Sequence, residues 1–311
     1  TYFIGRVSDD YGINMLEFIY YRKEKPNKKN KVSLDLSKAK TQTFYYDFPE
    51  EINFIKGLDY EFYFQVTDND AVSGNKVTKS QTYSFRKKTN EEQIQDLLNT
   101  QKETIKDLET TIQNKARQQQ SFLQIQKEIK NKKTFDWNDK KKVSEFIRMQ
   151  KQHQQMMERQ TETLQQTLKQ SNSDKQTLKE KKQQLQKRIE ELLALNKQKK
   201  LLDELQKITE KLDKEALIKK TKALAQKNKQ QERSLERILE LTKRFYVEEK
   251  TLQIANKLKT LSKRQDTINN TKNDAVNEQK KIEEDFEKIS KELENLTKDN
   301  KRLKNPLSIP R

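Results

Sequence analysis

The chain has 311 residues, no cysteine and a formal net charge of +18, carried by 66 Lys and Arg against 48 Asp and Glu. The absence of cysteine excludes a disulfide framework and any metal site with a Cys ligand, and it is compatible with an oxidising envelope compartment without requiring one. No apolar run approaches the roughly 18 residues that a membrane-spanning helix needs.

Glycine, proline and aromatic residues divide the chain into two regions. All four glycines and 17 of the 23 Phe and Tyr residues lie before residue 89, and residues 75–305 contain neither Gly nor Pro. Gly and Pro are the strongest breakers of regular structure, and the second region is rich in Lys, Glu, Gln and Leu, which favour helix. We therefore predict a mixed fold with separate β and α parts: a β domain over 1–88, a long helical coiled-coil or helical-hairpin region over 89–305, and an extended exit segment over 306–311.

The first region reads as a series of short strands separated by turn residues. Several of them alternate apolar and polar side chains with period two, as half-buried strands do. The pattern predicts an antiparallel β-sandwich. Its six strands are expected at 1–7, 12–23, 32–36, 41–48, 58–66 and 81–86.

Phe54, Gly57 and Tyr60 have the spacing of a tyrosine corner, in which a Tyr at the start of a late strand bonds back across the preceding loop. This spacing favours an immunoglobulin-like domain whose six strands are B to G. Strand A is then expected upstream of Thr1.

Two loops that this fold places at one pole of the sandwich carry hard oxygen ligands, Asp9, Asp10, Asp68, Asn69 and Asp70. If they converge, these side chains are candidates for a Ca²⁺ site. Asp and Asn also form Asx-turns and satisfy loose backbone donors at strand ends. No calcium-loop consensus is matched, so we favour turn formation and predict no metal and no cofactor.

The best helical pattern runs from Ile254 to Leu303. Alternate steps of four and three residues visit apolar side chains at eleven of fifteen positions, which predicts one coiled-coil seam over seven heptads. Phe286 and Ile289 lie mid-seam, and we expect both to be buried, against an upstream helix of the same chain. The stretch NNTKND, residues 269–274, has turn composition in the middle of this pattern.

Upstream, one helix is expected over 90–130 and a corner over 131–139, with Phe135 and Trp137 as hydrophobic plugs. A second helix then extends to 171–174.

At that second break, Ser173 and Gln176 have the spacing of a capping box for a new helix. The register slips again at NKQKK, residues 196–200. Segments of this kind, joined by short turns, favour antiparallel neighbours over a single rod.

Catalytic chemistry has few candidate residues. The only histidine, His153, falls on an apolar stripe between Phe146 and Met157, where a packed seam residue is expected rather than a base or metal ligand. The helical region contains no Gly-rich phosphate loop, and its carboxylates lie on exposed helix faces. We predict that the chain is not an enzyme.

Three stretches resemble a family of large Bacteroidota envelope proteins called domain of unknown function 4175: YFIGRVSDDYGI, YEFYFQVTDNDAVSGNKVTKSQTYSFRKKTNEE and LELTKRFYVEEKTLQIANKLKTLSKRQD. The resemblance covers most of the chain and is most specific at DDYGI and DNDAVSG. It implies an immunoglobulin-like domain before a helical region, transmembrane helices upstream of this fragment, and a periplasmic location in the cell envelope. The family has no established activity, so the resemblance implies no functional residues.

Two function classes remain. The favoured one is a non-enzymatic structural or scaffold part of a membrane-anchored envelope protein, with protein partners bound by the β domain or the helices and with homo-oligomers allowed. The alternative is a basic coiled-coil protein associated with nucleic acid, because residues 89–311 carry a surplus of 15 positive charges. Only 13 of the 66 basic residues are Arg, the usual choice for phosphate and base recognition, and the two signs are interleaved. Nucleic acid is therefore the less favoured partner.

Overall fold

The computed structural model describes residues 2–10, 12–36, 40–49, 52–70, 74–132, 134, 136–171, 176–195, 199–211, 213–268 and 275–309. The chain divides into two compact units, Thr1–Gln93 and Ile94–Arg311. We call them the β unit and the helical unit.

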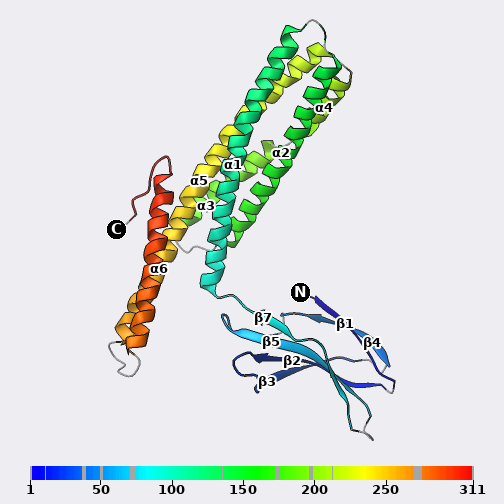
Figure 1. Cartoon of the computed structure of the whole chain (residues 1–311), viewed down its shortest axis with the longest axis vertical. Helices are drawn as coiled ribbons and strands as arrows, with labels where there is room; N and C mark the ends of the chain where they lie inside the picture. Colours follow the sequence, from blue (N-terminus) through cyan, green and yellow to red (C-terminus); the bar gives the residue numbers. More distant parts are fainter. Residues whose placement is uncertain are drawn as a thin grey trace. The chain divides into compact units, whose positions relative to one another are not determined.

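The β unit consists of antiparallel strands in two sheets (Figure 1). β1 pairs with β4, and the larger sheet has the order β3–β2–β5–β6, with β7 also paired to β5. The strands are β1 (Tyr2–Ser8), β2 (Ile13–Arg22), β3 (Lys29–Leu34), β4 (Thr41–Asp47), β5 (Asp59–Asp68), β6 (Val77–Lys79) and β7 (Tyr83–Arg86).

Aromatic side chains from both sheets form the core of the β unit. Phe18 of β2 stacks on Tyr46 of β4, with ring centroids 4.6 Å apart, and Phe62 of β5 stacks at the same distance on Phe48, the residue that follows β4. Along β4 the buried residues alternate with more exposed ones, because successive side chains of a strand point to opposite faces. In β2 and β5, Ile19 and Tyr63 on the opposite face are buried as well. The period-two pattern in the sequence thus predicted the buried faces of β4 and β5 correctly.

The hydroxyl of Tyr60 accepts a hydrogen bond from the backbone N–H of Ile55 at 3.3 Å. The chain between them turns at Gly57, whose φ is +82°, in the left-handed region that a residue with a Cβ rarely adopts. The ring of Phe54 packs edge-on against Tyr60, with centroids 4.7 Å apart. The bond expected from the spacing of these three residues is therefore present.

One strand assignment was wrong. In the lettering B to G the third strand is D, which belongs in the sheet that contains B and E. β3 instead pairs with β2, in the sheet that contains β5. The two-residue alternation determines which face of a strand is buried, but it does not determine which strand pairs with it. The short connection between β2 and β3 favours pairing of these two strands as a hairpin.

The helical unit contains long antiparallel helices that lie side by side over much of their length (Figure 1). Their bounds are α1 (Asn90–Asn131), α2 (Trp137–Gln170), α3 (Gln176–Leu195), α4 (Lys199–Glu210), α5 (Lys214–Ile268) and α6 (Ala275–Lys301). None of the helices in the described ranges is long and apolar enough to cross a membrane.

Reciprocal capping boxes start two of these helices. At α1 the hydroxyl of Thr89 accepts from the N–H of Glu92, whose carboxylate accepts in return from the N–H of Thr89. Asp136 and Asp139 form the same reciprocal pair at α2. Each box satisfies two backbone donors that the first helical turn leaves without partners. The predicted capping residue Ser173 lies outside the described residues.

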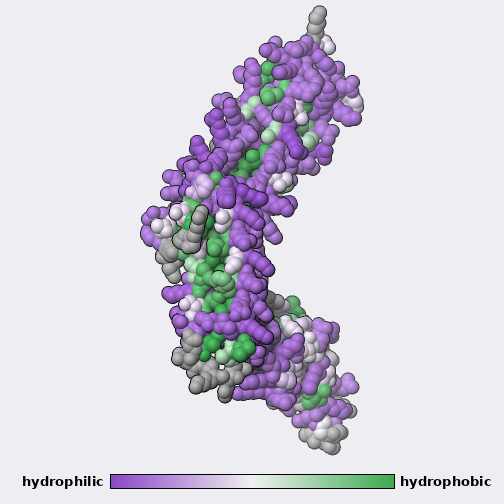
Figure 2. All heavy atoms as spheres, turned by 60° about the vertical axis from the view of Figure 1, so that its left-hand side comes forward, coloured by the Kyte–Doolittle hydropathy of each residue, from purple (hydrophilic) through white to green (hydrophobic). Residues whose placement is uncertain are grey.

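Buried positions recur every seven residues in three of the long helices. They are Gln101, Leu108, Lys115, Phe122 and Ile129 in α1, Val143, Gln150, Met157 and Leu164 in α2, and Leu217, Leu224, Gln231, Ile238 and Phe245 in α5. Such spacing keeps one stripe of each helix facing its neighbours. On one side of the surface, Figure 2 shows hydrophobic side chains in a band between hydrophilic ones.

The expectation of one continuous seam from Ile254 to Leu303 was wrong. α5 ends at Ile268 and α6 begins at Ala275, and the two helices run antiparallel; NNTKND, residues 269–274, lies outside the described residues. Arg264 Nη1 and Nη2 reach Asp285 at 2.9 Å and Glu278 at 2.7 Å across this hairpin. The apolar stripe packs against itself, because the two halves of a seven-residue repeat can pair by folding back as well as by extending.

The hairpin also changes which seam residues are buried. Ile254, Leu261, Ile282 and Ile289 are buried, but Phe286 is 54% exposed and Leu258 is 36% exposed. The expectation that Phe286 is buried was therefore wrong. The predicted plug Trp137 is likewise 69% exposed at the first turn of α2, and Phe135 lies outside the described residues.

Asn300 holds the chain that follows α6. Its side-chain amide donates to the carbonyl of Leu307 and accepts from the N–H of the same residue, both at 2.8 Å. Leu307 and Ile309 pack on the cluster of buried residues between α5 and α6. Residues 306–309, expected to be extended, contain no helix or strand and are held against the helices.

We expect Leu296→Ala to lower the free energy of unfolding by about 2–5 kcal/mol, because Leu296 is 1% exposed. Phe286→Ala should cost about 1 kcal/mol or less, because more than half of its side chain is already in water. Urea unfolding followed by helical circular dichroism measures both changes. Equal costs for the two variants would mean that Phe286 is covered in solution.

Candidate functional site

The structure brings the two acidic loops of the β unit together. The N–H of Asn69 donates to the carbonyl of Gly12 at 3.2 Å. Their carboxylates bond to the loops themselves: Asp9 accepts from the N–H of Gly12 at 2.9 Å, and Asp68 accepts from the N–H of Lys76 at 2.8 Å. These are the bonds that turn formation predicts.

Among the residues that the structure describes, no group of three or more His, Asp or Glu side chains is arranged to hold a metal ion. Asp10 and Asn69 are exposed, and Asp70 donates its backbone N–H to the Asp68 carboxylate at 3.4 Å. The candidates thus share one pole of the β unit without forming a ligand cage.

His153 lies in a polar layer in the core of the helical unit. It is 5% exposed on α2, and its buried Nε2 has no hydrogen-bond partner within the described ranges. Lys115 of α1, 3% exposed, donates to the Oε1 of Gln231 of α5 at 3.1 Å. His153 was expected to be a packed seam residue, and it is buried, but its neighbourhood is more polar than the stripe indicated.

Burial decides the charge of both groups in this layer. It lowers the pKa of Lys115 to about 8, with a small opposing effect of Glu232. It also lowers the pKa of His153 to about 4, and the positive charge of Lys115 acts in the same direction. His153 is therefore neutral at physiological pH. The sequence could have revealed Lys115, because it lies seven residues after Leu108 and seven before Phe122.

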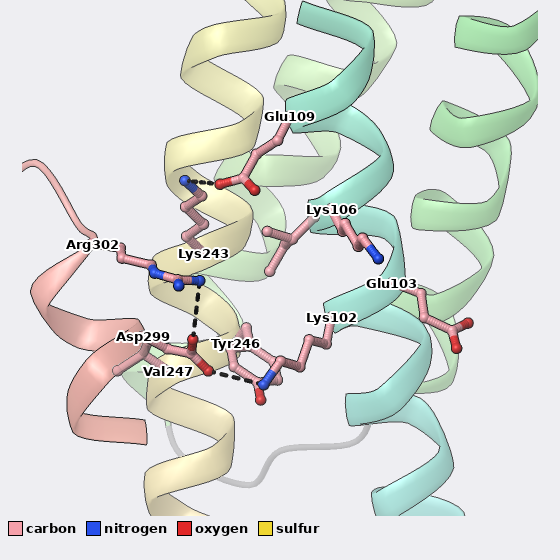
Figure 3. A pocket seen from close by; sticks show the side chains of 10 residues that line it. Lys102, Glu103, Lys106, Glu109, Lys243, Tyr246, Val247, Asp299 and Arg302 are labelled. Carbon is pink, nitrogen blue, oxygen red and sulfur yellow. Dashed lines mark hydrogen bonds and ion pairs between the residues drawn. The ribbon is translucent and has the colours of Figure 1, made fainter. Parts of the chain in front are cut away.

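A crevice of about 380 Å³ lies between α1, α5 and α6, with Ile105, Tyr246 and Val247 among its lining residues (Figure 3). Asp299 of α6 accepts from Lys102 of α1 at 3.3 Å, and Arg302 also reaches it.

On the upper side of the crevice, Lys243 of α5 pairs with Glu109 of α1 at 2.5 Å (Figure 3). Burial raises the pKa of the Tyr246 phenol to about 12, so this hydroxyl stays protonated. Four of the crevice's charged side chains, Lys102, Asp299, Glu109 and Lys243, thus hold helices to one another.

A second hollow, of about 660 Å³, runs between α5 and α6 nearer their connection. Leu258 and Leu261 of α5 and Ile282 and Phe286 of α6 give it apolar walls. We call it the hairpin groove.

Only one flank of the hairpin is covered by ion pairs. Lys257 pairs with Glu292 at 2.7 Å, and Arg264 pairs with Glu278 and Asp285. Along the groove, Glu283 and Glu287 of α6 have no ion-pair partner among the described side chains. The groove thus places exposed apolar side chains of two paired helices beside two carboxylates outside any ion pair among the described side chains, and it is the candidate functional site.

No protein-family model, curated protein or solved structure matches this chain significantly.

We expect neither EDTA nor millimolar Ca²⁺ to change the melting temperature of the β unit, because the loop carboxylates bond to backbone N–H groups. Near-ultraviolet circular dichroism of tyrosine monitors this unit, since nine of the ten Tyr residues precede residue 89. A rise with Ca²⁺ would show specific binding to the folded state and would contradict turn formation.

The layer around His153 predicts a pH dependence of stability. The unfolded chain protonates His153 near its ordinary pKa of 6.5 but the folded chain only near 4, so stability falls as the pH drops through this window and levels off below it. The loss is on the order of 3 kcal/mol, at 1.36 kcal/mol per pH unit.

The variant His153→Leu should lack that part of the loss, whereas the exposed neighbour change Gln152→Leu should keep it. Urea unfolding of both variants and of the unchanged chain at several pH values in this window gives the comparison. Parallel curves for the unchanged chain and His153→Leu would contradict the depressed pKa.

Proposed function

We propose that the chain is a non-enzymatic scaffold part of a larger envelope protein and that the hairpin groove binds one helix of a protein partner. The observation that carries this proposal is the half-open seam of α5 and α6. All four apolar residues of the groove lie at positions of the predicted heptads. Leu261 and Ile282 are buried, whereas Leu258 and Phe286 are 36% and 54% exposed.

A two-helix hairpin buries only part of such a stripe. In a bundle of three or more helices, the remaining seam positions pack against the additional helix. A partner helix with apolar residues at heptad spacing would therefore cover Leu258 and Phe286 and complete the packing. Helix-in-groove recognition uses this arrangement of anchors.

The negative charge along the groove indicates the charge of the partner helix. The charged side chains that line the groove are Glu283 and Glu287, and neither takes part in an ion pair among the described residues. A partner with Lys or Arg beside its apolar stripe complements this edge, and an acidic helix is repelled by it.

For the architecture, we propose an immunoglobulin-like sandwich followed by an antiparallel coiled coil. The aromatic packing between the sheets and the Tyr60–Ile55 bond support the first part. The seven-residue spacing of buried positions in α1, α2 and α5 supports the second.

For the cellular setting, we propose a membrane-anchored protein with this part in the periplasm. The support is the resemblance of the DDYGI and DNDAVSG stretches to the family domain of unknown function 4175. In that setting the helical unit would present the hairpin groove to other envelope proteins.

A designed helical peptide with Leu at its heptad positions and Lys on both flanks should bind the full chain more tightly than the same peptide with Glu flanks. The double change Leu258→Ser and Phe286→Ser should abolish binding. The pair Glu283→Lys and Glu287→Lys should reverse the preference between the peptides. Fluorescence anisotropy of labelled peptides measures each case.

Exposed Met156→Ser and Lys288→Ala are suitable controls, because neither residue lines the groove. Equal binding of both peptides, or binding that survives the Leu258 and Phe286 changes, would contradict the proposal. Sedimentation velocity tests whether a second copy fills the groove instead. A dimer that dissociates on the same double change would identify that occupant.

A further inference from the structure

The basic residues of the helical unit are concentrated at one end. Residues 127–142 and 207–222, which we call the tip, contain 13 Lys and 6 Asp or Glu, a surplus of seven, and no Arg. The whole of residues 89–311 carries a surplus of 15. Nearly half of the surplus therefore lies in about a seventh of that region.

The fold brings the two stretches of the tip together. They are the end of α1 with the start of α2, and the end of α4 with the start of α5, all at the upper end in Figure 1. Ile129, Val143, Leu205 and Leu217 belong to one buried cluster beneath them. The ammonium of Lys214 also donates to the carbonyl of Lys132.

Most of the described tip lysines form no ion pair with a described carboxylate. Lys132, Lys142 and Lys220 pair with carboxylates. No ion pair within the described residues involves Lys127, Lys130, Lys140, Lys141, Lys207, Lys211, Lys219 or Lys222. In the α5–α6 hairpin, Lys250, Lys257 and Arg264 pair across the two helices, whereas Lys259 and Lys263 form no ion pair with a described carboxylate. Along most of the helical unit, interleaved charges of both signs indicate a neutralised surface. At the tip, positive charges exceed negative ones.

Apolar groups are exposed among these ammonium groups. Trp137 is 69% exposed, and Lys141 Nζ lies 5.9 Å from the centre of its ring. A shallow groove of about 170 Å³ between α1 and α5 is lined by Leu123, 47% exposed, and by Ile129, Leu217 and Ile218. Its remaining lining residues include Lys127, Lys130 and Lys222.

We propose that the tip binds the surface of an anionic phospholipid bilayer. Unpaired lysines provide the attraction to negative head groups. Tryptophan is the side chain that most favours the level of the head groups, with its ring in the apolar boundary. The groove beside Lys127 and Lys130 offers apolar contact next to positive charge. An anionic phospholipid has the complementary pair, an apolar acyl chain next to a negative head group.

Nucleic acid fits the tip less well. Arg provides the planar, bidentate contacts to phosphate and bases, and the tip contains none. Lysine ammonium groups suit the diffuse negative potential of a lipid surface, and their long apolar stems can lie along it. This inference is independent of the hairpin groove, which uses different helical segments.

Trp137 makes the test direct, because it is the only tryptophan in the chain. Phosphatidylglycerol vesicles should shift its emission to shorter wavelength as the ring leaves water, whereas vesicles of pure phosphatidylcholine should not. The double change Lys130→Gln and Lys141→Gln should weaken partitioning about 30-fold, because each lysine near an anionic surface contributes roughly a factor of five.

The matched control is Lys179→Gln with Lys259→Gln, which removes the same charge from exposed positions of α3 and α5 away from the tip. This variant should partition like the unchanged chain. An equal loss in both double variants would show a general effect of net charge and overturn the local site. Absence of an emission shift with anionic vesicles would overturn it as well. A shift caused by oligonucleotides but not by vesicles would assign the tip to nucleic acid instead.

Discussion

The helical unit depends on burying one narrow stripe of side chains on each long helix. A stripe that recurs every seven residues cannot be covered by its own helix, so each helix requires neighbours. With no Gly or Pro between residues 75 and 305, nothing inside a helix favours an early end. The helices that follow two of the connections instead begin at side-chain caps. Asp136 caps α2, and Asp213 caps α5, where its carboxylate accepts from the N–H of Ala216 at 3.0 Å. The caps set where the chain turns back, and the stripe sets which faces meet.

Polar residues within the stripe place the helices in register. Gln101 donates to Glu249 at 2.6 Å, and Lys115 meets Gln231. A shift of α1 by one heptad along α5 would place Lys115 opposite Leu224 or Ile238, both apolar. Burial of Lys115 without an ion pair to any described carboxylate costs stability, and a defined helix register is the best-attested role of such buried polar groups. The ion pair of Asp299 with Lys102 joins α6 to α1 in the same way. Apolar packing therefore supplies the stability, and the polar layers select one arrangement.

The sequence predicted the division into a β part and a helical part, the faces of β4 and β5, and the extent of α1 and α2 to within a few residues. It failed where two patterns competed. The heptads from Ile254 to Leu303 continue across NNTKND, and periodicity alone does not distinguish a rod from a hairpin that folds on its midpoint. The start of α5 was missed because Asp213 is a single capping residue in a charged stretch. The groove at Phe286 follows from that hairpin, so it could not be predicted before the turn was known. Lys115 was missed because the stripe of this helix was traced through apolar side chains alone.

The length of α5 has a mechanical consequence. Its 55 residues form one uninterrupted helix, about 80 Å long at 1.5 Å per residue. Leu258 in the hairpin groove and Gln231 in the polar layer both belong to it, and no Gly or Pro lies between them to act as a joint. Torque or tension applied at the hairpin is therefore transmitted to the middle of the bundle along α5 alone. Any hinge in the helical unit must lie in the connections between helices, and the two ends of α5 move as parts of one rigid body.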